Sequence, residues 1–177
     1  IFNFLVVSAQ LNQEPKKITN KFFSDHNDIE NITPALKKKK GFTNYNELLN
    51  YIEEKVQNYP ELVSSNFIGE SQKGKKIPIV FIKKNKNNSD KKLRIWMQGG
   101  LHGNEPASTE SLLYLIHLIL EDPNYNYLLD KIELAISPMA NIDGFLKNDR
   151  YAANGLDLNR DHTKIMAPET KASIKAF

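Results

Sequence analysis

The stretch Leu93-Arg-Ile-Trp-Met-Gln-Gly-Gly-Leu-His-Gly-Asn-Glu-Pro106 joins an apolar run to a glycine-rich turn. Residues 93–98 are typical of a strand, and the glycines that follow allow tight backbone geometry. A long apolar segment from about 107 to 120 then predicts a helix, and residues 131–136 predict a further strand. Strand, helix and strand in this order favour an α/β sheet with parallel pairs, whose ligands bind at the carboxyl ends of the strands.

The region before this stretch predicts one more helix and two more strands. Apolar residues recur at helical spacing within residues 43–58, with Thr43 or Asn44 as the N-cap. Residues 62–70 and 77–83 are typical of two strands around a polar turn. We therefore expect a mixed, largely parallel sheet with helices on both of its faces.

The two ends of the sequence suggest how it is organised. Residues 1–9 begin with a short apolar run and end in Ser8-Ala9, which resembles the end of a secretory signal peptide; a buried strand is the alternative. Residues 10–42 are polar and rich in Lys and Asn, so we expect a tail or linker. Pro168 suits the first position of a helix that nothing in the sequence ends. We expect residues 43–177 to form the N-terminal part of a domain that is truncated at its C-terminus.

Composition narrows the classes of function. The chain has 177 residues, 40% hydrophobic and 25% charged, which is ordinary for a soluble globular protein. Its net charge is +3, and its one dense basic run is Lys37–Lys40, which no arginine or aromatic residue interrupts. We interpret this run as a solvated linker and expect no nucleic-acid partner and no stable membrane insertion. Because the chain has no cysteine, a transition metal must be bound by His, Asp or Glu.

His102 and Glu105 form the first candidate motif, three residues apart across the strand-to-helix junction. If Glu105 opens the helix, with Pro106 at its first position, both side chains can turn into one pocket above the sheet edge. An imidazole nitrogen and a carboxylate are suitable zinc ligands. The pattern alone is also consistent with a surface histidine beside a glutamate. His117, inside the apolar helix, is interpreted as a core or edge histidine.

A second polar stretch, within residues 137–162, follows the last predicted strand. It holds Arg150 and Arg160, two of the three arginines in the chain. The planar guanidinium of arginine suits carboxylates and developing oxyanions better than lysine does. Asn159 supplies a neutral amide donor for the same anion. Taken alone, the stretch is better explained as a loop held by Asn, Asp and Gly turn chemistry, with surface arginines.

The two motifs together resemble the M14 metallocarboxypeptidase family. The resemblance is carried by Gly99-Gly-Leu-His-Gly-Asn-Glu105, Asn141-Ile-Asp-Gly144, Arg150 and Gly155-Leu-Asp-Leu-Asn-Arg160, and it covers about residues 45–177. It implies an α/β fold of the zinc carboxypeptidase, or phosphorylase/hydrolase-like, type.

The resemblance also implies roles for particular residues. His102 and Glu105 correspond to the first two ligands of a single Zn²⁺ ion. Arg150 corresponds to the residue that polarises the scissile carbonyl and stabilises the oxyanion. Asn159 and Arg160 correspond to the pair that holds the terminal carboxylate of the substrate. The implied protein is a secreted or periplasmic zinc enzyme that releases C-terminal residues from peptides or proteins.

The sequence departs from the family pattern in two places and lacks some of its parts. Ile142 stands where the family usually has proline, and Asp161-His162 replaces an Asn-Phe or similar pair. The family's third zinc ligand, a histidine, and its general-base glutamate lie further downstream than Phe177. His162 is an alternative third ligand, disfavoured because it adjoins the predicted carboxylate-binding pair. We therefore expect the 177-residue chain to be inactive by itself.

Other functions stay open at this point. A zinc amidoacylase of the succinylglutamate desuccinylase or aspartoacylase type carries a similar glycine turn and Asp-Leu-Asn-Arg stretch, although Asn141-Ile-Asp-Gly144 and Asn154-Gly155 favour a peptidase. Cell-wall peptides are a further possible substrate. A module that binds peptide termini without hydrolysis is the alternative from another class. The sequence predicts neither the side-chain specificity nor the oligomeric state.

Overall fold

The computed structural model describes residues 17–18, 21, 31–84 and 92–177. The chain divides into a unit of residues 1–30, in which the three described residues are helical, and a compact unit of residues 31–177. The segment 1–9, for which we expect a signal peptide, lies outside the described residues. Among the described residues, no helix has the length and apolar character needed to cross a membrane.

The compact unit contains a four-stranded sheet and several helices, in an order close to the predicted one. The elements are α2 (Tyr45–Asn58), β1 (Val63–Glu70), β2 (Lys76–Ile82), β3 (Leu93–Gln98), α3 (Ala107–Glu121), the 3₁₀ helix η1 (Asn126–Asp130), β4 (Ile132–Ser137), α4 (Ile142–Lys147), α5 (Leu158–Asp161) and α6 (Pro168–Ala176).

The sheet has the strand order β1-β2-β4-β3 and is mixed, as expected. The expected predominance of parallel pairs is wrong for these four strands, because β1–β2 and β2–β4 are antiparallel and β3–β4 is parallel. A tight turn joins β1 to β2 and forces an antiparallel pair, whereas the helical crossover through α3 allows β3 and β4 to run in the same direction.

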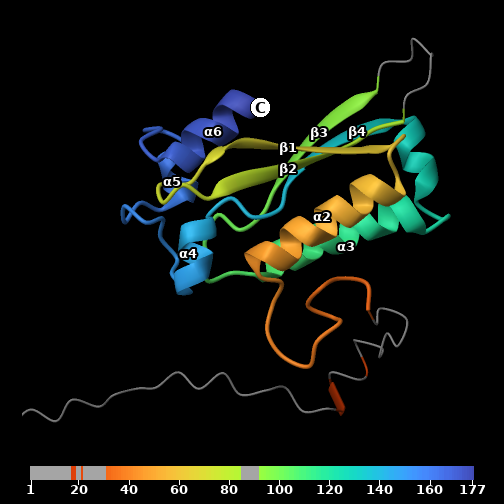
Figure 1. Ribbon diagram of the computed structural model, residues 1–177, viewed down its shortest axis with the longest axis horizontal. Coiled ribbons are helices and arrows are strands. Elements are labelled where there is room, and N and C mark those ends of the chain that lie inside the picture. Colours follow the sequence, from red (N-terminus) through yellow and green to blue (C-terminus); the bar gives the residue numbers. More distant parts are fainter. Residues whose placement is uncertain (1–16, 19–20, 22–30, 85–91) are drawn as a thin grey trace, which may run out of the picture. The chain divides into compact units, whose positions relative to one another are not determined.

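Helices cover both faces of the sheet, as predicted (Figure 1). Helices α2 and α3 lie together on one face, and α6 lies on the other. The main core lies between the sheet and the α2–α3 layer; its fully buried side chains include Leu48, Ile82, Leu113, Ile116 and Ile136.

Helix α2 begins with a capping box. The side chain of Asn44 accepts a hydrogen bond from the Glu47 amide at 3.0 Å, and the Glu47 carboxylate accepts one from the Asn44 amide at 2.8 Å. Both interactions satisfy amide groups that have no partner within the helix. Asn44, and not Thr43, is therefore the N-cap.

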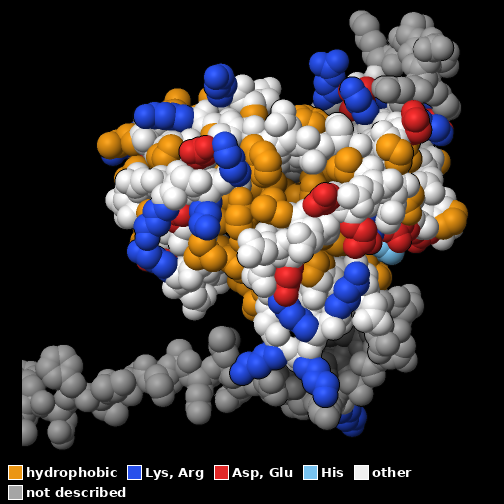
Figure 2. Space-filling model, viewed as in Figure 1, with side chains coloured by type: hydrophobic (Ala, Val, Ile, Leu, Met, Phe, Trp, Pro, Cys, Tyr) orange, Lys and Arg blue, Asp and Glu red, His pale blue; other side chains and the backbone are white. Residues whose placement is uncertain are grey.

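Helix α6 covers only one end of its face of the sheet. The side chain of Gln98 donates to the Ser173 hydroxyl at 2.9 Å, and the ring of Phe177 meets Trp96 edge to face at 6.1 Å between centroids. Figure 2 shows hydrophobic side chains gathered on the surface over the strands, between α6 and the α2–α3 layer. Phe81 lies in an open hollow of this face together with Trp96 and Phe177.

A charge cluster joins α2 to α3. The buried Lys55 ammonium lies 2.5 Å from the Glu121 carboxylate and 4.8 Å from the centre of the Tyr51 ring. His117 lies 3.2 Å from the other oxygen of Glu121, which agrees with its interpretation as an edge histidine. Burial raises the pKa of Glu121, but the hydrogen bond and charge of Lys55 and the charge of His117 hold that pKa below its ordinary value.

This cluster is expected to make stability depend on pH. A carboxyl group whose pKa is lower in the folded state stabilises the fold above its unfolded pKa, and this contribution is lost as the pH falls through the folded value. The urea midpoint of the wild type should therefore fall more steeply below about pH 5 than that of Glu121→Gln. The exposed Glu61→Gln should behave like the wild type. Equal pH dependence in the wild type and Glu121→Gln would contradict this assignment.

Candidate metal centre

The loops that follow β3 and β4 leave the sheet at the same edge and are bonded to each other. The amides of Ala140 and Asn141 donate to the carbonyls of Gly99 and Gly100, at 3.0 and 2.9 Å. Because β3 and β4 are parallel, both loops stand at carboxyl ends of strands, which is where ligands of such sheets bind.

The side chain of Asn141 ties three segments together. Its oxygen caps α4 by accepting from the Gly144 amide at 2.9 Å. Its amide nitrogen donates to the carbonyls of Leu101 and Arg150, at 3.2 and 3.3 Å. A fully buried asparagine thus fixes the loop that carries His102 relative to the segment that carries Arg150.

Gly103 lies directly against the first turn of α4. A Cβ atom at this position would lie 2.1 Å from the carbonyl carbon of Gly144 and 2.6 Å from the carbonyl oxygen of Asp149. Both atoms belong to the backbone and cannot move aside independently. Only glycine fits here, between His102 and Glu105.

The imidazole of His102 lies between two carboxylates. Its Nδ1 atom is 3.1 Å from Oε2 of Glu105, and its Nε2 atom is 3.1 Å from Oδ1 of Asp157. A neutral imidazole carries one N–H, so it can donate to only one of these carboxylates. With the proton on Nε2, the lone pair of Nδ1 is left facing the Glu105 carboxylate oxygen.

Arg150 closes the cluster from the other side. Its Nη1 atom donates to Glu105 Oε1 at 3.0 Å, and its Nε and Nη2 atoms donate to Asp157 Oδ2 at 3.3 and 3.2 Å. His102, Glu105, Arg150 and Asp157 therefore form a closed ring of contacts. The structure brings together three residues that the sequence predicts as site residues and adds a fourth.

Asp157 is the residue that sequence reasoning missed. It is the N-cap of α5, and its Oδ1 atom accepts from the Asn159 amide at 3.0 Å. Burial raises the pKa of Asp157, but hydrogen bonds from His102 and Arg150 outweigh this and leave the pKa lowered. The available signal was an aspartate at a helix start within the Gly-Leu-Asp-Leu-Asn-Arg motif.

Asn159 and Arg160 lie on α5 next to this ring, with exposed side chains. In the part of the chain that the structure describes, neither side chain makes a hydrogen bond or ion pair with the other site residues. The structure thus places the predicted pair two and three residues beyond Asp157, open to solvent.

The segment after Arg160 is held by Asp161. This buried carboxylate accepts hydrogen bonds from the amides of Met166, at 3.0 and 3.1 Å, and Ala167, at 2.8 Å. Burial raises the pKa of Asp161, but these amide hydrogen bonds outweigh burial and hold the pKa below its ordinary value. The departure from the family pattern at this position therefore has a structural role.

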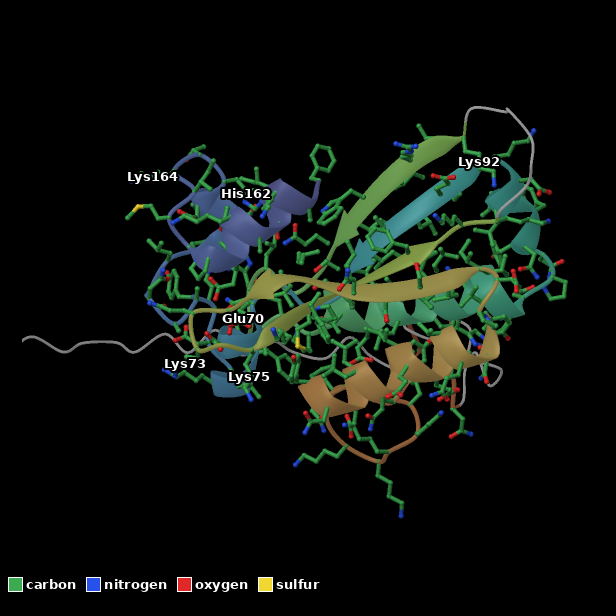
Figure 3. The ribbon with its side chains drawn as sticks, turned by 45° about the horizontal axis from the view of Figure 1, so that its top comes forward. Glu70, Lys73, Lys75, Lys92, His162 and Lys164 are labelled. Atoms are coloured by element: carbon green, nitrogen blue, oxygen red, sulfur yellow. The ribbon has the colours of Figure 1, made fainter. Side chains whose placement is uncertain are left out.

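His162 does not join the ring. Its Nδ1 atom lies 2.8 Å from the carbonyl of Leu158, within its own short helix. Figure 3 shows its label on the α5–α6 segment, close to that of Lys164. This contact does not support His162 as a third metal ligand.

The ring contains side chains of the types that bind zinc, but it does not form a complete ligand set. Nδ1 of His102 and a carboxylate oxygen of Glu105 converge, and the other imidazole nitrogen is engaged by a second carboxylate, which is the usual arrangement around metal-bound histidines. Over the described ranges, no group of three His, Asp or Glu side chains has the geometry to hold a metal. The described residues therefore hold a His–Glu pair but not the three protein ligands that a catalytic zinc site uses.

The site is a His–Glu pair at the carboxyl end of a strand in a mixed α/β sheet, backed by an arginine and an orienting aspartate. The comparison with known families makes this specific. The zinc carboxypeptidase model, M14, matches residues 48–176, and the chain belongs to this family.

Relatives and solved structures agree with this assignment. The chain is 36% identical to carboxypeptidase 2 of Trichophyton rubrum over 112 residues, which are 60% of this chain and 21% of the fungal protein. It is 32% identical to carboxypeptidase B of Helicoverpa zea over 119 residues, 62% of this chain and 27% of that protein. The carboxypeptidase A structure from Helicoverpa armigera superposes with a TM-score of 0.72 at 21% identity, covering 91% of this chain and 48% of that one.

Replacing Gly103 by alanine is expected to destabilise the chain by about 2–4 kcal/mol, because a methyl group cannot fit against the α4 backbone. Urea unfolding followed by circular dichroism measures this cost. Asn104→Ala, one residue along and exposed, is the matched control and should change the midpoint little. A fully stable Gly103→Ala protein would mean that the loop and α4 are not packed as described.

Proposed function

We propose that this chain is the N-terminal part of a zinc metallocarboxypeptidase that releases C-terminal residues from peptides or proteins. The observation that carries the proposal is the ring of His102, Glu105, Arg150 and Asp157 at the carboxyl end of β3. Membership of the zinc carboxypeptidase family supports the same reaction.

His102 and Glu105 would hold the zinc ion through Nδ1 and a carboxylate oxygen. Asp157 keeps the proton of His102 on Nε2, which leaves the Nδ1 lone pair available and fixes the plane of the ring. When bound, zinc supplies a Lewis acid that polarises the scissile carbonyl and acidifies a water molecule.

Arg150 would stabilise the negative charge that develops on the carbonyl oxygen. A guanidinium has five N–H donors, and Arg150 uses three of them on Glu105 and Asp157, which leaves two for a substrate. The two carboxylates also fix its orientation before the substrate arrives. One well-placed donor of this kind contributes about 3–4 kcal/mol to the stabilisation of a transition state.

Asn159 and Arg160 would bind the free carboxylate at the end of the substrate. Both side chains are exposed, and both stand next to the residue that orients His102. A carboxylate held by the arginine fork places the last peptide bond, and no other, beside the metal.

The active enzyme, in this proposal, extends beyond Phe177. The matched part spans 21% of the fungal relative and 48% of the insect structure, and a third ligand and a general base are needed in addition to the residues described. A secreted or periplasmic location is part of the proposal and rests on the apolar run that ends in Ser8-Ala9.

Zinc binding by this chain tests whether the site needs a third protein ligand in addition to His102 and Glu105. The 177-residue chain should bind zinc weakly in competition with a chromophoric chelator. Tight, equimolar binding would instead indicate a self-sufficient site and favour a module that binds peptide ends without the rest of the enzyme.

The variant Arg160→Ala tests the role in carboxylate binding. In the active enzyme, we expect the KM for peptides with a free C-terminus to rise roughly 10- to 100-fold, because a charged hydrogen-bonded pair contributes about 1.5–3 kcal/mol. Hydrolysis of amidated peptides should change little, and the exposed Lys164→Ala should change neither.

Equal effects of Arg160→Ala on free and amidated peptides would contradict the carboxylate role. Faster hydrolysis of N-acyl amino acids than of peptides would contradict the peptidase assignment and favour the zinc amidoacylase, the second enzyme class that the motifs allow.

A further inference from the structure

The segment before α2 is fastened to the first turn of α3. The carboxylate of Glu110 accepts from the Thr43 amide at 2.7 Å, from the Thr43 hydroxyl at 2.9 Å and from the Thr33 hydroxyl at 3.4 Å. Thr33 and Thr43 are 2% and 0% exposed. Figure 1 shows this segment as the loop that leads into α2. Residues 31–42, expected to belong to a polar tail, are thus part of the compact unit.

The same turn of α3 holds the metal-binding loop. The hydroxyl of Ser108 accepts from the Gly100 amide at 2.9 Å, and the buried hydroxyl of Thr109 donates to the Pro138 carbonyl at 2.7 Å. Three consecutive side chains of one helical turn therefore bind three different segments. The loop with His102 and Glu105 lies between Gly100 and Pro106, which directly precedes this turn.

Within the described residues, the start of helix α3 has no side-chain cap. Its N-cap is Pro106, which makes no side-chain capping hydrogen bond. A helix start without a cap frays more readily than one with a cap. The only acidic residue in its first turn, Glu110, is turned toward the N-terminal segment.

The segment is also tied to α2. The ammonium of Lys38 lies 2.6 Å from the carboxylate of Glu47 and donates to the Phe42 carbonyl at 2.8 Å. Residues 31–43 therefore bridge the capped start of α2 and the uncapped start of α3. Movement of this bridge would be transmitted to the turn that holds the loop of His102.

We propose that residues 31–43 form a clamp on the first turn of α3 and that Glu110 is a positioning residue for the metal-binding pair. The clamp limits fraying of α3, which keeps Ser108 and Thr109 bonded to the loops after β3 and β4. His102 and Glu105 stay converged as a result. The consequence for metal binding rests on the proposed zinc function, whereas the consequence for loop order does not.

Native-state hydrogen exchange on the metal-free 177-residue chain tests the clamp. In Glu110→Ala, the amides of Gly100 and Glu105 should exchange about ten-fold faster than in the wild type, because hydrogen bonds to a charged group are lost. Amides in the β2–β4 pair should change less. Glu110→Gln keeps one acceptor oxygen and should restore most of the protection. If Glu110→Ala does not fold, Thr43→Val removes one bond and should give a smaller change of the same kind.

Glu47→Ala is the matched control, since it removes the Lys38 pair and the α2 capping box but leaves Glu110 intact. It should lower overall stability and expose Gly100 and Glu105 less than Glu110→Ala does, because the bonds of Glu110 to Thr33 and Thr43 remain. If the Gly100 and Glu105 amides exchanged equally fast in Glu110→Ala and Glu47→Ala, the clamp would be contradicted. Glu110 would then have only a general role in stability. Zinc affinity should fall in Glu110→Ala and be restored in Glu110→Gln. Failure of the wild type to bind zinc at all would contradict the proposed function, while the exchange result would still decide the clamp.

Discussion

The carboxylate of Asp157 makes the contacts on which the rest of the site depends. One of its oxygens faces His102 and the α5 amide of Asn159, and the other accepts two hydrogen bonds from Arg150. A single side chain thereby fixes the imidazole, the guanidinium and the start of the helix with the exposed Asn–Arg pair. Because His102 lies 55 residues from Asp157 in the sequence, its alignment with Arg150 and α5 depends on this one anion being held in place.

The fold contributes to the site chiefly through the parallel strands β3 and β4, whose carboxyl ends carry the loops of the ring. Strands β3 and β4 end side by side, and Asn141 with Gly103 sets the spacing of the loops that follow them. The remaining elements build a core under the sheet and cover it. One end of the opposite face stays apolar and open beside α6. The insect carboxypeptidase A structure is about twice as long as the part that this chain matches.

Much of this arrangement could be predicted from local sequence patterns. Strand and helix periodicity placed α2, α3 and the four strands, and the glycine turn placed His102 and Glu105 at a strand end. Pairing directions could not be read in the same way, since nothing local to β2 says that it lies antiparallel to β4. The role of Asp157 and the burial of Thr33 could not be predicted for a similar reason. Asp157 contacts His102, 55 residues away, and Thr33 contacts Glu110, 77 residues away.

We propose that Asp157 directs Nδ1 of His102 toward a metal shared with Glu105. Zinc titration of the chain with ¹⁵N-labelled histidine tests it directly, with His102→Gln used to assign the resonances. We predict that the Nδ1 signal of His102 moves on zinc addition while Nε2 stays protonated and His117 and His162 are unchanged. Zinc binding at Nε2 of His102, or a response confined to another histidine, would contradict the account.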